Sequence, residues 1–334
     1  MAEDDFSPNR SASSGAPSQP SSSSKSSQIE LAIRYLSHFL DISSSHFSQI
    51  TPYALLNDSR LSGEISSLLH QQDSGVGDNK VCRWLYDTFQ SSVHELQLIV
   101  LRFIPIICGL YLSRLHLKKP LAGFEAVLLA IYAFETASRG TQADTINIAA
   151  LSDPSIYNER KDFQRNTAVN KMNSTEINLA VVSPALEPHG TMKSTKRARI
   201  VGVVLELFYK NVALMPIESK VEFCDFVALW AGQNGDSSSE EAKKQKNGRI
   251  CLPWELLQPV LRILGHCLLG PNVEKEGKQY LAASAACRCL YDRALQEMNP
   301  NAILATRSLL RLGNMGAEGD YTEIPMAESV TITS

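Results

Sequence analysis

The most apolar stretch of the chain, residues 96–117, reads LQLIVLRFIPIICGLYLSRLHL. Arg102 and Arg114 bracket its uninterrupted apolar run, which covers only residues 103–112. A helix needs about 20 mostly apolar residues to cross the roughly 30 Å of hydrocarbon in a bilayer. The stretch therefore predicts a core helix of a soluble protein and not a membrane span.

Apolar side chains recur at helical intervals on both sides of this stretch. Before it, Ser27 and Glu30 have the spacing of a capping box, which predicts that order begins near residue 28. After it, Ser219 and Glu222 have the same spacing ahead of another helix. The stripes that we expect to be buried are Ile29, Ala32, Ile33, Leu36 and Leu40; Val81, Trp84, Leu85, Thr88 and Phe89; and Phe223, Phe226, Val227 and Trp230.

Two prolines predict the starts of the last helices. Pro253 precedes an apolar stripe that Gly270 and Pro271 end, and Pro300 opens a final helix that ends near Gly313. No repeat of fixed period is found, so the pattern does not indicate a regular solenoid. We predict a mainly α fold, either an irregular multi-helix bundle or a set of stacked helical pairs.

Two segments break the helical pattern and favour a small antiparallel β-ribbon. Both 145–149 and 176–182 carry alternating β-branched or aliphatic residues. Residues 1–27 are rich in serine, proline and glycine, which predicts a disordered tail before a helical domain over 28–313. Polar composition predicts mobile loops near 158–171 and 232–247 and a flexible tail over 314–334.

The bulk composition fits a globular protein in a reducing compartment. Of the 334 residues, 44% are hydrophobic and 20% charged, and the net charge of −3 provides no overall attraction to nucleic acid. The first five residues, MAEDD, lack the basic and apolar regions of a secretory signal. An odd, irregularly spaced set of cysteines predicts buried, reduced thiols: Cys82, Cys108, Cys224, Cys251, Cys267, Cys287 and Cys289.

No recognised catalytic, nucleotide-binding or metal-binding motif occurs in the sequence. The pair His94 and Glu95 begins H-E-x-x-H, but Leu98 stands where the second zinc ligand is required. Cys287 and Cys289 are two residues apart, so on a helix they do not share a face, and we expect a close helix contact there. The sequence predicts no catalytic, cofactor-binding or metal-binding residues, and hence no enzyme.

A compact basic stretch precedes one apolar helix and allows several interpretations. It consists of Lys193, Lys196, Arg197 and Arg199. It is typical of a solvated loop and helix start, of a contact with anionic lipid headgroups, of a nuclear-import patch, or of a contact with an acidic partner surface. These alternatives leave open a nuclear or signalling adaptor that uses this stretch and the serine-rich tail as regulated peptides.

Three segments in the middle of the chain resemble the hyccin family. They are Phe103-Ile104-Pro105 with Tyr111-Leu112; Gly123 followed by FEAVLLAIY; and LSDPSIYNE over 151–159. The most specific part is the Ser-x-Pro-Ser-aliphatic-Tyr motif, in which Pro154, Ile156 and Tyr157 are expected to form an ordered corner or partner contact. The resemblance extends over roughly 28–313, and the serine-rich start is a departure from it.

The resemblance implies a helical, non-catalytic subunit of the plasma-membrane phosphatidylinositol 4-kinase complex. In that family the protein binds a tetratricopeptide-repeat scaffold, which holds the type III alpha lipid kinase and a membrane-anchored adaptor. The resemblance thus implies a protein of the cytoplasm and plasma membrane that reaches the membrane through partners and needs no cofactor. Animal relatives carry a long polar tail after the last helix, and functions of that tail are not expected here.

Overall fold

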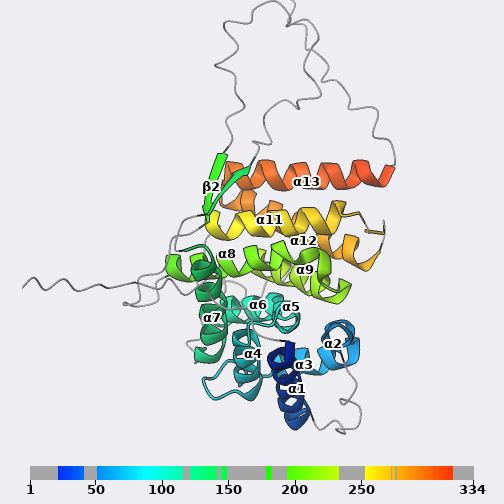
Figure 1. The fold of residues 1–334 in the computed structure, drawn as a ribbon. Helices are drawn as coiled ribbons and strands as arrows, with labels where there is room; N and C mark the ends of the chain where they lie inside the picture. Colours follow the sequence, from blue (N-terminus) through cyan, green and yellow to red (C-terminus); the bar gives the residue numbers. More distant parts are fainter. Residues whose placement is uncertain are drawn as a thin grey trace, which may run out of the picture.

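The fold of the computed structural model is mainly α, as predicted (Figure 1). The structure describes residues 22–40, 51–115, 121–140, 144–148, 178–182, 194–232, 253–271, 273–274 and 277–318. The helices are α1 (Ser22–Phe39), α2 (Pro52–Asn57), α3 (Ser59–His70), α4 (Lys80–Gln90), α5 (His94–Arg102), α6 (Ile104–Arg114), α7 (Ala122–Ser138), α8 (Ser194–Lys210), η5 (Val212–Leu214), α9 (Ile217–Ala231), α11 (Trp254–Leu269), α12 (Lys278–Gln296) and α13 (Pro300–Glu318).

Two short strands, β1 (Asp144–Ile148) and β2 (Asn178–Val182), accompany the helices. They pair antiparallel, with Ile146 opposite Ala180, in the two segments that carry the alternating pattern. The predicted loops near 158–171 and 232–247 lie outside the described residues, except for Gly232 at the end of α9.

The helices stack in two columns, from α1 and α2 at the bottom of Figure 1 to α13 at the top. We name α3, α6, α9 and α12, together with α2 and α5, which Arg102 joins to α3, the first column. Helices α4, α7, α8, α11 and α13 form the second column. In the second column, α8 and α11 run parallel, because Gly202 and Glu206 of α8 meet Glu255 and Arg262 of α11 in the same order. Helices α4 and α7 also run parallel, as the contacts Cys82–Gly123 and Phe89–Phe134 show. Helices α11 and α13 do so through Gly265–Leu309 and Leu268–Gly313.

Each helix of a column forms one level of the stack. The number of residues between successive levels is irregular, which explains why the sequence has no visible repeat period. In the first column, bonded residues on successive levels are 44, 117 and 63 positions apart. In the second column, separations of 75 and 56 join α7 to α8 and α8 to α11. Of the two arrangements that we predicted, the structure has the stacked helices, without a constant number of residues between successive levels.

The predicted apolar stripes form the core between the columns. Trp84, Leu85 and Phe89 of α4 are buried, as are Phe223 and Val227 of α9. Pro253 caps α11, Gly270 ends it and Pro300 begins α13, which confirms the proline and glycine signals. The periodic placement of large apolar side chains was thus sufficient to identify which helix faces are buried.

The apolar stretch over 96–117 is part of this core, although a bend divides it into α5 and α6. Among the described helices, none is long and apolar enough to span a membrane by itself. Taken together, α5 and α6 pass a test of length and composition, with a bend of 45° between them. Most of their side chains are buried in the stack, including Ile99, Phe103 and Ile107.

The predicted capping box at Ser219 and Glu222 is wrong. Helix α9 begins at Ile217 after Pro216, and no side chain caps it. Ser219 instead donates a hydrogen bond of 2.7 Å to the carbonyl of Arg102, and Ser66 of α3 donates to Glu222 at 3.3 Å. Tertiary contacts take both side chains, because α9 packs on α6 and its hydrogen bonds reach Ser66 of α3 and Arg102 at the end of α5.

Two helix ends also differ from the prediction. Helix α1 begins at Ser22, six residues before the expected boundary, because a helix held by its apolar stripe extends by one hydrogen bond per added residue. Helix α13 continues past Gly313 to Glu318. Gly313 is buried, and a Cβ at this position would make ordinary contacts with Tyr280 and Leu268, so this glycine lies within the packed part of the helix and does not end it.

Candidate partner-binding surface

The basic stretch lies at the start of α8, where it is partly used inside the protein. Lys193 is outside the described residues, while Lys196, Arg197 and Arg199 are half-buried. Arg197 Nε donates to Tyr111 Oη at 3.1 Å and lies 4.0 Å from a carboxylate oxygen of Glu125.

Tyr111 in turn donates to Glu125 at 2.9 Å, so this group of side chains joins α6, α7 and α8. Burial of Tyr111 raises the pKa of its hydroxyl well above the usual range, and the hydroxyl stays protonated as the donor. Arg197 is therefore engaged inside the protein and is less available for the predicted contact with an anionic surface. Pro154, Ile156 and Tyr157 lie outside the described residues, so their role stays a prediction.

A groove of about 780 Å³ runs between α1 and α4. Ala32, Trp84 and Thr88 form its buried floor, where the indole Nε1 of Trp84 donates a hydrogen bond of 3.0 Å to the Ala32 carbonyl. The α1 wall exposes Leu31 and Tyr35, which are 45% and 55% accessible. Large apolar side chains left exposed beside a hollow are typical of protein-binding surfaces.

The opposite wall of this α1–α4 groove is charged. Lys80, Arg83, Asp87 and Gln90 of α4 line it and are exposed. His38 lies on the α1 side near one end. The groove therefore combines an apolar wall with a polar wall on which cationic side chains outnumber acidic ones.

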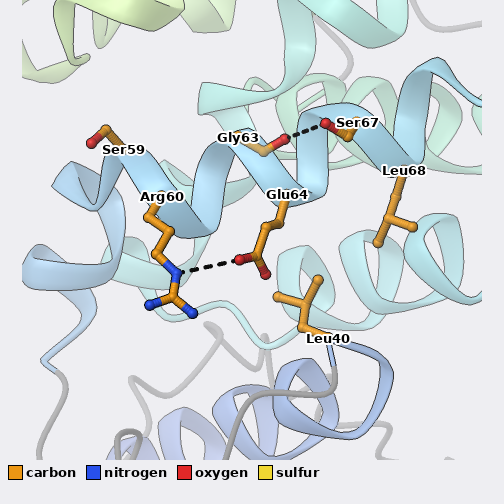
Figure 2. A pocket seen from close by; sticks show the side chains of 7 residues that line it. All are labelled: Leu40, Ser59, Arg60, Gly63, Glu64, Ser67 and Leu68. Carbon is orange, nitrogen blue, oxygen red and sulfur yellow. Dashed lines mark hydrogen bonds and ion pairs between the residues drawn. The ribbon is translucent and has the colours of Figure 1, made fainter.

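A second, shallower groove of about 580 Å³ lies between α3 and the end of α1. Figure 2 shows Leu40 facing Glu64 and Leu68 across this hollow. Arg60 and Glu64 form a surface ion pair at 3.4 Å, and nothing lies within 4 Å of the position a Cβ on Gly63 would take. The absent side chain at Gly63 contributes to the hollow, but the rim is polar and open.

In the first column, arginines connect neighbouring helices by donating hydrogen bonds to backbone carbonyls at helix ends. Buried Arg102 donates to the carbonyl of Leu56 in α2 and, at 2.5 Å, to Ser62 of α3. Arg114 donates to the carbonyls of His70 and Gln71 at the end of α3.

Arg293 of α12 makes the same kind of contact. It donates a hydrogen bond of 2.6 Å to the carbonyl of Trp230 in the last turn of α9. The last carbonyls of a helix have no partner within it and carry its negative dipole end, so a guanidinium is a favourable partner there.

In the second column, carboxylates connect neighbouring helices through ion pairs. Glu135 of α7 accepts hydrogen bonds of 2.5 Å from Arg139 and from Lys210 of α8. Burial pushes the pKa of Glu135 upward, but Lys210 and Arg139 outweigh this effect and hold the pKa below its ordinary value. Glu206 of α8 pairs with Arg262 of α11, yet its burial keeps the pKa raised. Buried charges of this kind join neighbouring helices in fixed register.

The cysteines of the described residues are mostly buried, as predicted. Burial raises the pKa of Cys82 to about 11 and that of Cys287 to about 12, so both remain protonated thiols near neutral pH. In the part of the chain that the structure describes, no group of three or more His, Cys, Asp or Glu side chains could hold a metal ion.

The sequence identified the buried stripe of α1 but not the groove beside it. Leu31 and Tyr35 are one turn apart, on a face next to the stripe that contains Ala32 and Leu36. Two apolar residues at this spacing outside the stripe are the only local signal. Their significance depends on the charged wall that α4 places opposite.

The chain matches a known protein family. The Hyccin family model matches residues 48–334, which include every described element except α1. The match covers far more than half of the chain, in agreement with the resemblance of its middle segments. The chain therefore belongs to the hyccin family.

Proposed function

We propose that this chain is a non-enzymatic scaffold subunit that binds a tetratricopeptide-repeat protein and stabilises a phosphatidylinositol 4-kinase complex at the plasma membrane. In this way it supports the synthesis of phosphatidylinositol 4-phosphate. Membership in the hyccin family supports this role. The observation that carries it in this chain is the α1–α4 groove, an open surface that combines exposed apolar side chains with a wall on which cationic side chains outnumber acidic ones.

The construction of the stack supports a scaffolding role. Adjacent levels are joined by arginine–carbonyl contacts in the first column and by ion pairs in the second column. These contacts hold the outer faces of the helices in a fixed relation to one another. A rigid surface loses little conformational entropy when a partner binds, which favours a stable assembly.

Recruitment to the membrane in this proposal depends on partners. Four basic residues near an anionic leaflet contribute about 1 kcal/mol each, or roughly 4 kcal/mol for Lys193, Lys196, Arg197 and Arg199 together. This corresponds to affinities of about a millimolar, too weak to hold a protein at a surface alone. Arg197 is engaged with Tyr111 and Glu125, which lowers the contribution further.

Quantitative affinity purification of the full chain from its own cells tests the proposal. We expect the repeat-protein scaffold, the type III alpha lipid kinase and the membrane-anchored adaptor in near-stoichiometric yield. Depletion of the repeat protein should release the chain from the membrane fraction. Recovery of nuclear-import factors in place of a lipid kinase would contradict the proposal and support the nuclear or signalling adaptor.

A further inference from the structure

The α1–α4 groove depends on a helix that lies outside the family match. The Hyccin model begins at residue 48, whereas α1 covers Ser22–Phe39. Helix α1 packs on the domain through a buried stripe of Ala32, Ile33 and Leu36, and Trp84 donates to its backbone. One wall of the groove therefore belongs to α1, outside the matched residues, and the other belongs to α4, inside them.

The dimensions of the groove fit a helix. Its lining extends from Gln28 to His38 on α1 and from Lys80 to Ser91 on α4. Each stretch is about three helical turns, or roughly 15 Å. A helix laid between two others buries one face against both, which is a common mode of peptide recognition. A short amphipathic segment of about three turns would fill the hollow.

The chemistry of the two walls indicates how such a helix would be oriented. Leu31 and Tyr35 on α1 offer apolar surface to side chains spaced three or four residues apart. On α4, the single acid, Asp87, is one turn from Arg83 and two turns from Lys80, so the cationic side chains outnumber it by two to one. Acidic side chains on the edge of the bound helix that faces α4 would pair with Lys80 and Arg83.

We propose that the α1–α4 groove binds one amphipathic helix of the repeat-protein partner. The apolar stripe of this helix packs on Leu31, Tyr35 and the edge of Trp84, and its acidic edge faces Lys80 and Arg83. This inference rests on the proposed function, because it assigns the interface of the same partner. Charge complementarity selects an acidic helix over a basic one, and the apolar wall selects a protein over a free anion.

Binding of the full chain to the purified repeat protein, measured at low and at physiological salt, tests the groove. Tyr35→Asp removes an apolar anchor and Arg83→Glu reverses the charged wall, and we expect each to weaken binding about tenfold or more. Arg83→Glu should also reduce the salt dependence of the dissociation constant. Both side chains are exposed, so the melting temperature should remain close to that of the wild type.

Matched controls lie on other helices. Tyr53→Asp changes an exposed tyrosine of α2 in the same way, and Arg311→Glu reverses an exposed arginine of α13. Both should bind the repeat protein like the wild type. Amide hydrogen exchange should show protection of α1 and α4 in the complex.

The possible results separate the two proposals. If the wild type binds the repeat protein but the groove variants bind equally well, the groove inference is wrong and the proposed function stands. If the wild type does not bind, the proposed function itself fails. Tighter binding by Arg83→Glu would overturn the acidic character of the bound helix. Loss of self-association in Tyr35→Asp, with unchanged partner binding, would assign the groove to a second copy of the chain.

Discussion

The two columns of the stack hold their levels together by different chemistry. In the first column, Arg102, Arg114 and Arg293 donate to backbone carbonyls at the ends of α2, α3 and α9. In the second column, Glu135 and Glu206 pair with cationic side chains of the adjacent helix. A guanidinium bound to a carbonyl does not titrate near neutral pH, whereas a carboxylate pair depends on pH. The stability of the two columns should therefore respond differently to substitution and to acid.

Arg102→Ala should have the largest effect on stability. It leaves the Leu56 carbonyl and the Ser62 hydroxyl without their buried donor and opens a cavity at the junction of α2, α3 and α5. Lost hydrogen bonds and the cavity together are expected to lower the free energy of unfolding by about 4 kcal/mol. Urea denaturation of the full chain measures this change.

Arg60→Ala is the matched control for this substitution. The Arg60 side chain is 72% exposed in its pair with Glu64, so its loss should cost less than about 0.5 kcal/mol. A loss below 1 kcal/mol for Arg102→Ala would show that arginine–carbonyl contacts do not hold the first column together.

Glu135→Gln should destabilise the second column by about 2 kcal/mol at pH 7, because Arg139, whose side chain is 11% exposed, and half-exposed Lys210 lose their counter-charge. The pKa of Glu135 lies below its ordinary value, so its stabilisation is complete above about pH 4.5 and is lost as the pH falls through the folded-state pKa. The difference in melting temperature between wild type and variant should shrink below pH 4.5. A difference that is constant from pH 7 to pH 3 would mean that packing, and not charge, accounts for the effect.

Glu222→Gln should produce a smaller effect of the opposite sign. Burial raises the pKa of Glu222 to about 7, although Arg102 and Ser66 act against the increase. Its Oε2 atom is buried, and it has no hydrogen-bond partner among the described residues. The folded state therefore binds a proton between about pH 4.5 and pH 7, and stability falls as the pH rises through that range.

An amide at position 222 removes this cost and should stabilise the protein by about 1 kcal/mol at pH 8, with little gain at pH 4.5. Thermal melts of wild type and variant at the two pH values provide the comparison. Equal melting temperatures at pH 8 would mean that folding does not raise the pKa of this carboxyl.

Hydrophobic periodicity predicted several of the helices, among them α4, α9 and α11, because each stripe is a local property of about ten residues. The stripes containing Trp84 and Phe223 are buried as expected, and the proline signals at Pro253 and Pro300 are confirmed. Local signals failed where tertiary contacts compete for the same side chain. Ser219 had the spacing of a helix cap, but the Arg102 carbonyl takes its hydroxyl.

The sequence by itself determined the fold class, the buried helix faces and the family, since these depend on residue type and short spacing. Only the tertiary structure decided which helices are neighbours, because the separation between levels varies from 44 to 117 residues in the first column. It also decided where the candidate site lies. The α1–α4 groove brings Tyr35 and Arg83 to opposite walls, and their pairing depends on how α1 packs on α4, which no local pattern encodes.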